Sequence, residues 1–246
     1  MSHLPSKSGI RAVVDTAASL CTIAVTVIAM VVVLRGGVPG AAPRGPAGAP
    51  APRPAPPLPS TPLSLTGAST KGSATAKVAL IEYSDFQCPY CGKFARETLP
   101  TIEKEFVDTG SVLLAFRHLP LEKLHANALG AATAAECAAV QGHFWPAHDY
   151  FFQHQDHLAK DDLIQAASSL GVNRPAFMAC MDAGTPAGKI KADADSAQEL
   201  QITGTPTFFV GRIGPDGRVK VTQRLSGAQP LEAFRNALKT LSAPVG

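Results

Sequence analysis

The chain has 246 residues, of which 46% are hydrophobic and 17% charged, and its formal net charge is +3 at pH 7. This composition suits one globular domain plus an additional segment, and it excludes a highly charged disordered chain or a coiled coil. All aromatic residues lie at or after Tyr83, and the chain beyond residue 66 is nearly neutral without a cluster of Lys or Arg. Because nucleic-acid binding needs a basic face that neutralises several phosphates, we expect no nucleic acid as a partner.

The first apolar segment runs without a charge from Thr16 to Leu34 and ends at Arg35. A helix of this length spans about 28 Å, close to the hydrocarbon thickness of a bilayer. The sequence therefore predicts a transmembrane signal anchor over 12–35, preceded by a short cytoplasmic tail over 1–11. A cleaved signal peptide is an alternative, although its apolar region is usually shorter. A buried core helix is another, but no partner helices follow.

A Pro-rich segment comes next. Residues 36–62 contain 10 Pro, 6 Ala and 5 Gly, a composition that buries no core and favours extended backbone. The sequence predicts a semi-rigid linker over 36–74 that leads to a folded domain over 75–243. The Pro-x-x-Pro spacings also match ligands of Pro-binding modules, but Pro-rich linkers produce such matches by chance.

The folded domain opens with a strand, a turn and a helix. The run VALIEYS from Val78 is typical of a buried strand, and FQCPYC and an apolar pattern at helical spacing follow it. Pro89 suits the first helical turn, so the free N–H groups and the positive end of the dipole face Cys88 and stabilise its thiolate. Cys91 lies one turn further on and is placed to attack a mixed disulfide on Cys88. This predicts a redox-active disulfide, with no other cofactor.

Zinc binding is the alternative for any CxxC pair. No second CxxC and no paired His follow at the usual spacing. Six of the seven His residues lie between His118 and His157, and His154 and His157 stand three apart. This spacing matches no metal-binding template. We therefore expect no metal and assign the His residues to the surface and to helix packing.

A third motif, GTPTFFVG from Gly204, places a Pro at the start of an apolar strand. Together with VALIEYSDFQCPYCGKF and AAECAAVQGHFWPAHDYFF it resembles the DsbA-like thiol:disulfide oxidoreductases of the thioredoxin superfamily, from about residue 77 to residue 241. The resemblance implies an α/β thioredoxin fold with an inserted helical domain. It also implies that the Thr205–Pro206 peptide is cis, that Pro206 faces Cys88, and that the Thr205 backbone pairs with an extended substrate.

Two further positions bear on the chemistry. Glu82, six residues before Cys88, matches the buried acid of this family, which exchanges a proton with the residue at Cys91. Burial would raise the pKa of this carboxyl toward the range that a proton shuttle needs, whereas an edge-strand carboxylate in water is the alternative. Tyr90 stands where the strongest oxidants of the family have His, so the resemblance predicts a weaker oxidant.

The spacing between the motifs predicts the insertion. Cys88 and Pro206 are 118 positions apart, which leaves an Ala-rich segment with helical spacing over about 121–200. Glutaredoxins also carry CPYC but lack such an insertion, which argues against glutathione chemistry. After the insertion, the sequence predicts a hairpin around Pro215-Asp216-Gly217 and a closing amphipathic helix.

Cys137 and Cys180 fall in two of the predicted inserted helices. Some DsbA-like proteins have a structural disulfide at this place, so the resemblance implies a bridge between them. It would close a loop of 44 residues and stabilise the fold by about 4 kcal/mol. Two buried free thiols, which behave as small apolar residues, are the alternative.

The sequence as a whole predicts a single-pass membrane protein whose extracytoplasmic domain introduces disulfides into unfolded or reduced exported proteins. The resemblance implies a quinone-linked membrane partner of the DsbB or vitamin K epoxide reductase type as the reoxidant. An oxidase with a structural disulfide also requires a compartment outside the reducing cytosol. A reductase or isomerase of the same fold, a tethered peptide-binding chaperone and a cytosolic membrane-bound reductant are the alternatives.

Overall fold

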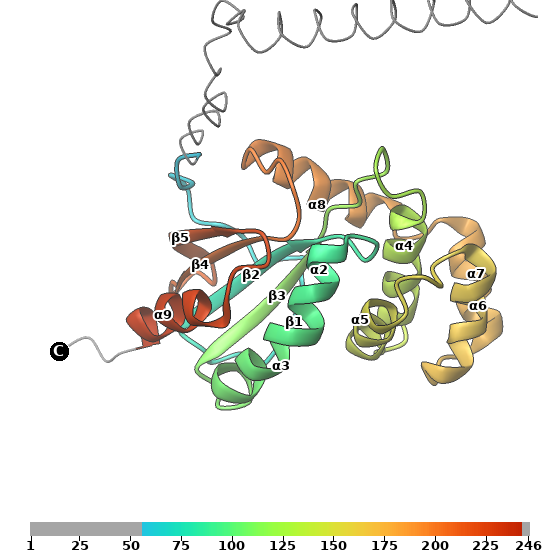
Figure 1. Ribbon diagram of the computed structural model, residues 1–246, viewed down its shortest axis with the longest axis horizontal. Coiled ribbons are helices and arrows are strands. Elements are labelled where there is room, and N and C mark those ends of the chain that lie inside the picture. Colours follow the sequence, from blue (N-terminus) through green and yellow to red (C-terminus); the bar gives the residue numbers. More distant parts are fainter. Residues whose placement is uncertain (1–55, 243–246) are drawn as a thin grey trace, which may run out of the picture. The chain divides into compact units, whose positions relative to one another are not determined.

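The computed structural model describes residues 56–242. The predicted tail over 1–11, the anchor over 12–35 and most of the linker lie outside these residues. Among residues 56–242, no helix is both long and apolar enough to cross a membrane. The described chain forms a five-stranded sheet with helices on both faces (Figure 1).

The strand order of the sheet is β1-β3-β2-β4-β5. The central strand β2 is parallel to β3 and antiparallel to β4, and the two outer pairings are antiparallel. The strands are β1 (Ser69–Lys71), β2 (Val78–Ser84), β3 (Val112–His118), β4 (Thr207–Ile213) and β5 (Val219–Ser226). The hairpin of β4 and β5 confirms the predicted turn around residues 215–217.

One nearly continuous helical segment follows β2 and contains two π-helical stretches. Its parts are α2 (Pro89–Lys93), η1 (Phe94–Thr98), α3 (Leu99–Ile102) and η2 (Glu103–Val107). The closing helix α9 (Leu231–Ser242) packs on the same face of the sheet. On this face Phe94, Phe208 and Phe234 form the centre of a buried cluster.

The helical insertion predicted over about 121–200 is confirmed. Its helices are α4 (Ala128–Ala139), α5 (Phe144–Gln153), α6 (Lys160–Ser169), α7 (Arg174–Ala183) and α8 (Ala187–Glu199). Figure 1 shows α4 to α7 gathered beside the sheet and α8 leading back toward it. The insertion and the sheet share one core, in which Phe86 and Phe116 stack at 5.3 Å between ring centroids and Phe151 and Phe152 close around them. A disulfide joins Cys137 in α4 to Cys180 in α7.

A buried ion pair and a buried hydrogen bond connect the sheet to the insertion. Arg117 on β3 lies 2.5 Å from Asp193 on α8, and His118 lies 2.8 Å from Glu136 on α4. The backbone N–H of His118 also donates to Asp193, at 3.1 Å. Removing one partner of such a buried pair would leave an uncompensated charge, so this network holds the insertion in a defined orientation on β3.

The predicted boundary between linker and domain at residue 75 is wrong. Residues 56–74, here called the N-terminal arm, pack along the sheet: β1 pairs with β3, and Leu63 exchanges two backbone hydrogen bonds with Val219, at 2.9 and 2.7 Å. The guanidinium of Arg117 donates to the carbonyls of Ser64 and Thr66, at 2.7 and 2.9 Å. The arm is held by these backbone hydrogen bonds and by three small or aliphatic side chains that pack against the core, Leu63, Leu65 and Ala68. A Pro-rich segment without aromatic residues gave no sign of such packing in the sequence.

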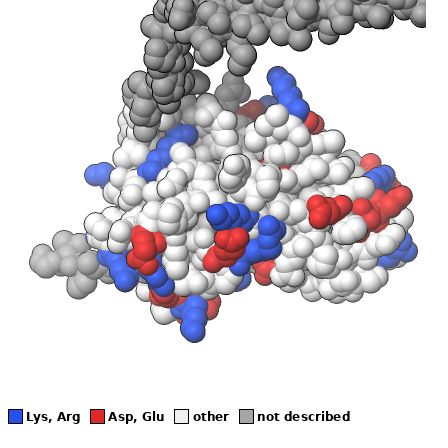
Figure 2. Space-filling view, viewed as in Figure 1, with Lys and Arg blue, Asp and Glu red and all other residues white. Residues whose placement is uncertain are grey.

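Charges of both signs are mixed over the surface. Figure 2 shows Lys and Arg next to Asp and Glu over the visible face. The i,i+4 pair of Lys191 and Asp195 and the pair of Lys160 and Asp182 are examples.

Candidate active site

The CPYC motif lies at the turn from β2 into α2. Cys88 is the N-cap residue of α2, and Pro89 occupies the first helical position, where its missing N–H is not needed. The backbone N–H of Cys88 donates to the carbonyl of Asp85 at 3.1 Å, and the Asp85 carboxylate accepts from the backbone N–H of Gln87 at 2.8 Å. The turn is thus closed by local hydrogen bonds, which present the Cys88 side chain at the helix start.

The fold brings the GTPTFF motif to Cys88. The peptide between Thr205 and Pro206 is cis, and the Cys88 sulfur lies 3.4 Å from the carbonyl oxygen of Thr205. Cys88 and Cys91 are both free thiols in this structure. Tyr90, between them, is 64% exposed, so the motif reaches the surface of the domain at this residue.

The surroundings of Cys88 favour its thiolate. A hydrogen bond from the Cys91 thiol makes the largest contribution and lowers the pKa of Cys88 to about 5, although burial opposes this shift. The Thr205 side chain and the backbone N–H groups of Cys91 and Tyr90 also favour the charged form. At neutral pH Cys88 therefore carries a negative charge, which makes it a nucleophile and a good leaving group.

Cys91 behaves in the opposite way. It is fully buried, and this burial raises the pKa of its thiol well above the ordinary value, with further contributions from Cys88 and from the charge of Glu82. Cys91 thus keeps its proton while Cys88 is ionised. This division between a charged outer sulfur and a protonated inner sulfur is what stepwise thiol–disulfide exchange requires.

Glu82 lies on the central strand β2 and is 1% exposed. Burial raises the pKa of its carboxyl to about 8, and the nearby Ser84 hydroxyl opposes part of this rise. The alternative of an edge-strand carboxylate in water is wrong, because β3 and β4 flank β2 on both sides. Ser84 also acts on Cys91, whose pKa it lowers. Ser84 was missed in the sequence, although its position two residues after Glu82 places both on one face of the strand.

Two more polar groups at the turn were not predicted. The buried carboxylate of Asp85 accepts a hydrogen bond from the backbone N–H of Leu121 at 2.8 Å and lies 2.8 Å from Nδ1 of His125. Gln155 contacts the turn from the insertion and donates to the carbonyl of Cys88 at 2.9 Å. Gln155 follows Cys88 by 67 positions, and no local pattern points to it.

Several His residues of the described chain take part in packing and hydrogen bonding. His118 and His148 are buried, and Nδ1 of His154 lies 2.8 Å from the Tyr150 carbonyl at the end of α5. In the described part of the chain, no group of three or more His, Cys, Asp and Glu residues is arranged to hold a metal ion.

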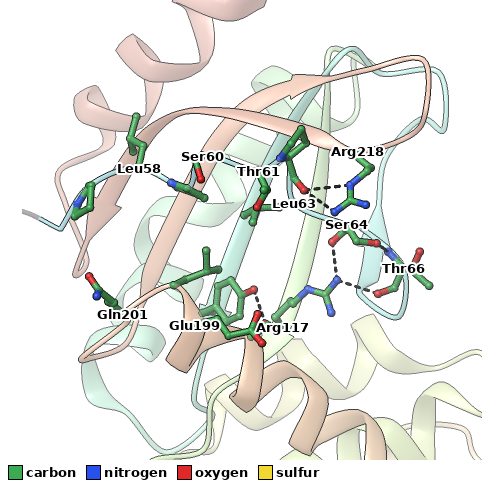
Figure 3. Close-up of a pocket in the computed structure, with 16 residues that line it drawn as sticks. Leu58, Ser60, Thr61, Leu63, Ser64, Thr66, Arg117, Glu199, Gln201 and Arg218 are labelled. Carbon is green, nitrogen blue, oxygen red and sulfur yellow. Dashed lines mark hydrogen bonds between the residues drawn. The ribbon is translucent and has the colours of Figure 1, made fainter.

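A separate cavity of about 590 Å³ lies beside the arm (Figure 3). Tyr83, Arg117, Glu199 and Arg218 are among its lining residues, and neither Cys88 nor Cys91 lines it. The guanidinium of Arg218 donates to the carbonyl of Pro62 at 2.9 Å, and that of Arg117 to arm carbonyls as described above. The cavity walls are thus formed by contacts that hold the arm.

Comparison with known proteins agrees with this geometry. A family model described as Thioredoxin matches residues 65–223. The chain is a DsbA-like member of the thioredoxin superfamily. The match begins ahead of the boundary predicted at residue 75 and so includes part of the arm, in agreement with the pairing of β1.

Solved structures of DsbA-like proteins superpose on most of the domain. Alpha-DsbA1 of Wolbachia pipientis is 26% identical, with a TM-score of 0.65 over 73% of this chain and 93% of that chain. BdbD of Bacillus subtilis in its oxidised form is 24% identical, with a TM-score of 0.64 over 75% of this chain and 98% of that chain. At 24% identity, the likeness to BdbD shows that the two proteins share a fold.

The curated relatives are longer proteins. A protein of Salinispora tropica named Na(+)/H(+) antiporter NhaA 3 is 42% identical over 167 residues, which are 68% of this chain and 25% of that protein. A protein named NhaA 1 of Salinispora arenicola is 38% identical over 140 residues, which are 57% of this chain and 21% of that protein. The chain thus spans about a quarter of the length of the curated relatives it matches.

Proposed function

We propose that the DsbA-like domain is an extracytoplasmic thiol:disulfide oxidoreductase that introduces disulfides into exported proteins. The observation that carries the proposal is the unequal pair in the CPYC motif. Cys88 has a pKa of about 5 beside Thr205, whereas the pKa of buried Cys91 is raised. The predicted anchor over 12–35 would hold the domain at the membrane.

The reaction begins with Cys88 and Cys91 joined in a disulfide. A substrate thiolate attacks the Cys88 sulfur, a mixed disulfide forms, and Cys91 leaves and takes up a proton. A second substrate thiolate then attacks the substrate sulfur of the mixed disulfide and releases Cys88 as a thiolate. The substrate loses two electrons and two protons, the enzyme disulfide gains both electrons, one proton stays on Cys91, and the other passes to solvent.

Glu82 is the proposed proton donor and acceptor for Cys91. Its pKa of about 8 keeps the carboxyl protonated at neutral pH while leaving it able to release its proton. A group with a pKa near the operating pH is the most effective general acid or base. Glu82 thus supplies the proton when Cys91 leaves and accepts it when the disulfide is formed again.

The direction of the reaction follows from the stability of the reduced form. A thiolate with a low pKa is a good leaving group, and stabilising it favours the reduced enzyme and therefore oxidation of the substrate. Tyr90 offers no cationic N–H to the Cys88 sulfur, so we expect a weaker oxidant than proteins with His at this position. The Thr205 carbonyl, 3.4 Å from Cys88, would lie beside an extended substrate segment.

Turnover requires an oxidant for the reduced pair. We propose a membrane protein linked to a quinone, of the DsbB or vitamin K epoxide reductase type, which would accept two electrons and two protons for each disulfide. Such a partner fits a domain tethered at the membrane. It also fits an oxidising compartment, where the disulfide between Cys137 and Cys180 would persist.

The test is the reduction potential of the Cys88–Cys91 pair in the purified full chain. The protein is equilibrated with mixtures of reduced and oxidised glutathione, free thiols are trapped, and the CPYC peptide is quantified by mass spectrometry. We expect a potential above about −200 mV, toward the oxidising end of the range. A value near about −270 mV, as in thioredoxin, would overturn the proposed direction and identify a reductase.

A further inference from the structure

Gln155 joins the helical insertion to the redox turn. It lies in the segment between α5 and α6, and its side chain is partly buried. Its Nε2 donates to the carbonyl of Phe86 at 2.7 Å and to the carbonyl of Cys88 at 2.9 Å. One carboxamide thus holds two backbone carbonyls of the turn that carries the nucleophile.

The other end of the same carboxamide is also held. Its Oε1 accepts a hydrogen bond from Nη1 of Arg96 at 3.0 Å, and Arg96 also donates to the carbonyl of Phe152 at the end of α5. With its acceptor and both donors engaged, the amide has a single orientation. Gln155 and Arg96 together form a brace between α5, the helical segment after the CPYC motif, and the turn itself.

Gly92 provides the space for this brace. A Cβ atom at position 92 would lie 1.9 Å from Oε1 of Gln155 and 2.7 Å from Nη1 of Arg96, distances that no real Cβ tolerates. The backbone N–H of Gly92 also donates to the Cys88 carbonyl, at 3.0 Å. The present position of the Gln155 carboxamide therefore depends on a glycine at position 92, since a Cβ atom there would displace the ends of the Gln155 and Arg96 side chains.

We propose that Gln155 is a positioning residue for thiol–disulfide exchange: by holding the carbonyls of Phe86 and Cys88, it keeps the backbone N–H groups of Tyr90 and Cys91 directed at the Cys88 sulfur. The inference rests on the proposed oxidoreductase function and names the contact through which the insertion influences it. The Gln155 amide is neutral, so its influence is geometric.

Loss of the Gln155 contact is expected to raise the pKa of Cys88 and to lower the reduction potential of the pair. Without Gln155 the Cys88 carbonyl keeps the hydrogen bond from Gly92 but loses the one from the insertion, so the N–H groups that favour the thiolate are held less well. The pKa of Cys88 then rises, which makes Cys88 less reactive below neutral pH and a poorer leaving group. The reduced enzyme is less stabilised, and the potential of the pair falls.

The test compares Gln155→Ala with Gln141→Ala in the full chain. Gln141 lies in the same insertion and also bonds to backbone, since its Oε1 accepts from the N–H of Asn173 at 2.7 Å, but it does not touch the redox turn. The readout is the pH profile of Cys88 alkylation, followed by mass spectrometry of its peptide, together with the reduction potential and the free energy of unfolding.

We expect Gln155→Ala to raise the pKa of Cys88 by about 0.7 unit, the size of one hydrogen bond. Alkylation of Cys88 should therefore slow by about fivefold at pH 4 and about threefold at pH 5, and the potential should fall. Gln141→Ala should leave the pH profile unchanged while costing comparable stability. An unchanged profile in Gln155→Ala, or an equal shift in both variants, would overturn the positioning role.

Gln155→Glu keeps the size of the side chain and tests the inference if the alanine variant does not fold. A carboxylate cannot donate to the carbonyls of Phe86 and Cys88, and its charge opposes the thiolate. We therefore expect a larger slowing than in Gln155→Ala, and no slowing would count against the proposal. The alkylation profile does not depend on the direction of electron flow, so a thioredoxin-like potential of the native chain would refute the oxidase function and leave this result intact.

Discussion

The two cysteine pairs of the domain differ in every respect that controls thiol chemistry. Cys88 and Cys91 are three positions apart at the start of a helix, with an ionised sulfur beside Thr205. Cys137 and Cys180 are 43 positions apart and join α4 to α7 in a disulfide.

This difference shows that burial alone does not set the reactivity of a sulfur, because the hydrogen-bond donors around it also matter. Cys88 and Cys137 are 4% and 1% exposed, yet only Cys88 lies where hydrogen-bond donors converge on its sulfur. The Cys137 sulfur packs among the apolar residues of the insertion. The first pair is thus suited to exchange and the second to holding helices together.

The largest expected effect is the loss of exchange in Cys88→Ser. Without the attacking and leaving sulfur, oxidation of a reduced peptide should fall by at least about 10³-fold, because the thiolate is the reactive species. The measurement is the rate of disulfide formation in that peptide. If Cys88→Ser instead keeps the full activity of the native chain toward unfolded proteins, measured as prevention of their aggregation, the domain is a chaperone.

Removal of the second pair should affect stability and leave exchange intact. Cys137→Ser combined with Cys180→Ser should lower the free energy of unfolding by about 4 kcal/mol, because the unfolded chain regains the entropy of a long loop. Urea denaturation measures the loss, with Cys88→Ser as the matched control. A change in Cys88 alkylation as large as the change in stability would contradict the division between the two pairs.

Glu82→Gln should slow the proton-dependent step and change the pH dependence of stability. In the native chain the buried carboxyl holds its proton up to pH about 8, whereas the unfolded chain releases it near 4.5. Folding stability therefore falls as pH rises between these values, and the variant should lose this slope. Reduction of the Cys88–Cys91 disulfide by a peptide dithiol should slow by about 10²-fold at pH 7.

The slope is measured by urea denaturation at pH 5 and pH 8 on the oxidised protein, in which neither Cys88 nor Cys91 titrates. Glu97→Gln, which alters an exposed carboxylate on the helical segment after the motif, is the matched control. Equal slopes in the native chain and in Glu82→Gln would show that Glu82 is hydrated in solution.

Thr205→Val should have the smallest effect of the four changes predicted in this comparison of the cysteine pairs and their surroundings. The variant removes a hydroxyl that favours the Cys88 thiolate, so the pKa of Cys88 should rise by about one unit, the size of one hydrogen bond to a charged group. The alkylation profile measures this shift. Thr207→Val is the control, because the Thr207 hydroxyl donates to the Gly204 carbonyl at 2.8 Å. Equal shifts in both variants would indicate a general loosening of the loop.

Several features of the site could be predicted because they depend on residues close together in the chain. The order of strand, turn and helix around Cys88, the position of Pro89 and the turn of the last hairpin follow from local backbone preferences. The pairing of Cys137 with Cys180 and the position of the cis Thr205–Pro206 peptide beside Cys88 came from the resemblance to DsbA-like proteins, since composition and spacing allow other arrangements.

The sequence by itself determined which residues start the reactive helix, the presence of a helical insertion and the approximate extent of the domain. Only the tertiary structure decided that Glu82 is buried, because this depends on β2 lying between β3 and β4. It also decided that residues 56–74 belong to the domain and that Gln155 reaches Cys88. The contacts of the arm and of Gln155 join backbone groups to residues far away in the sequence. Because a backbone carbonyl accepts a hydrogen bond from any donor that the fold brings to it, no local sequence pattern marks such contacts.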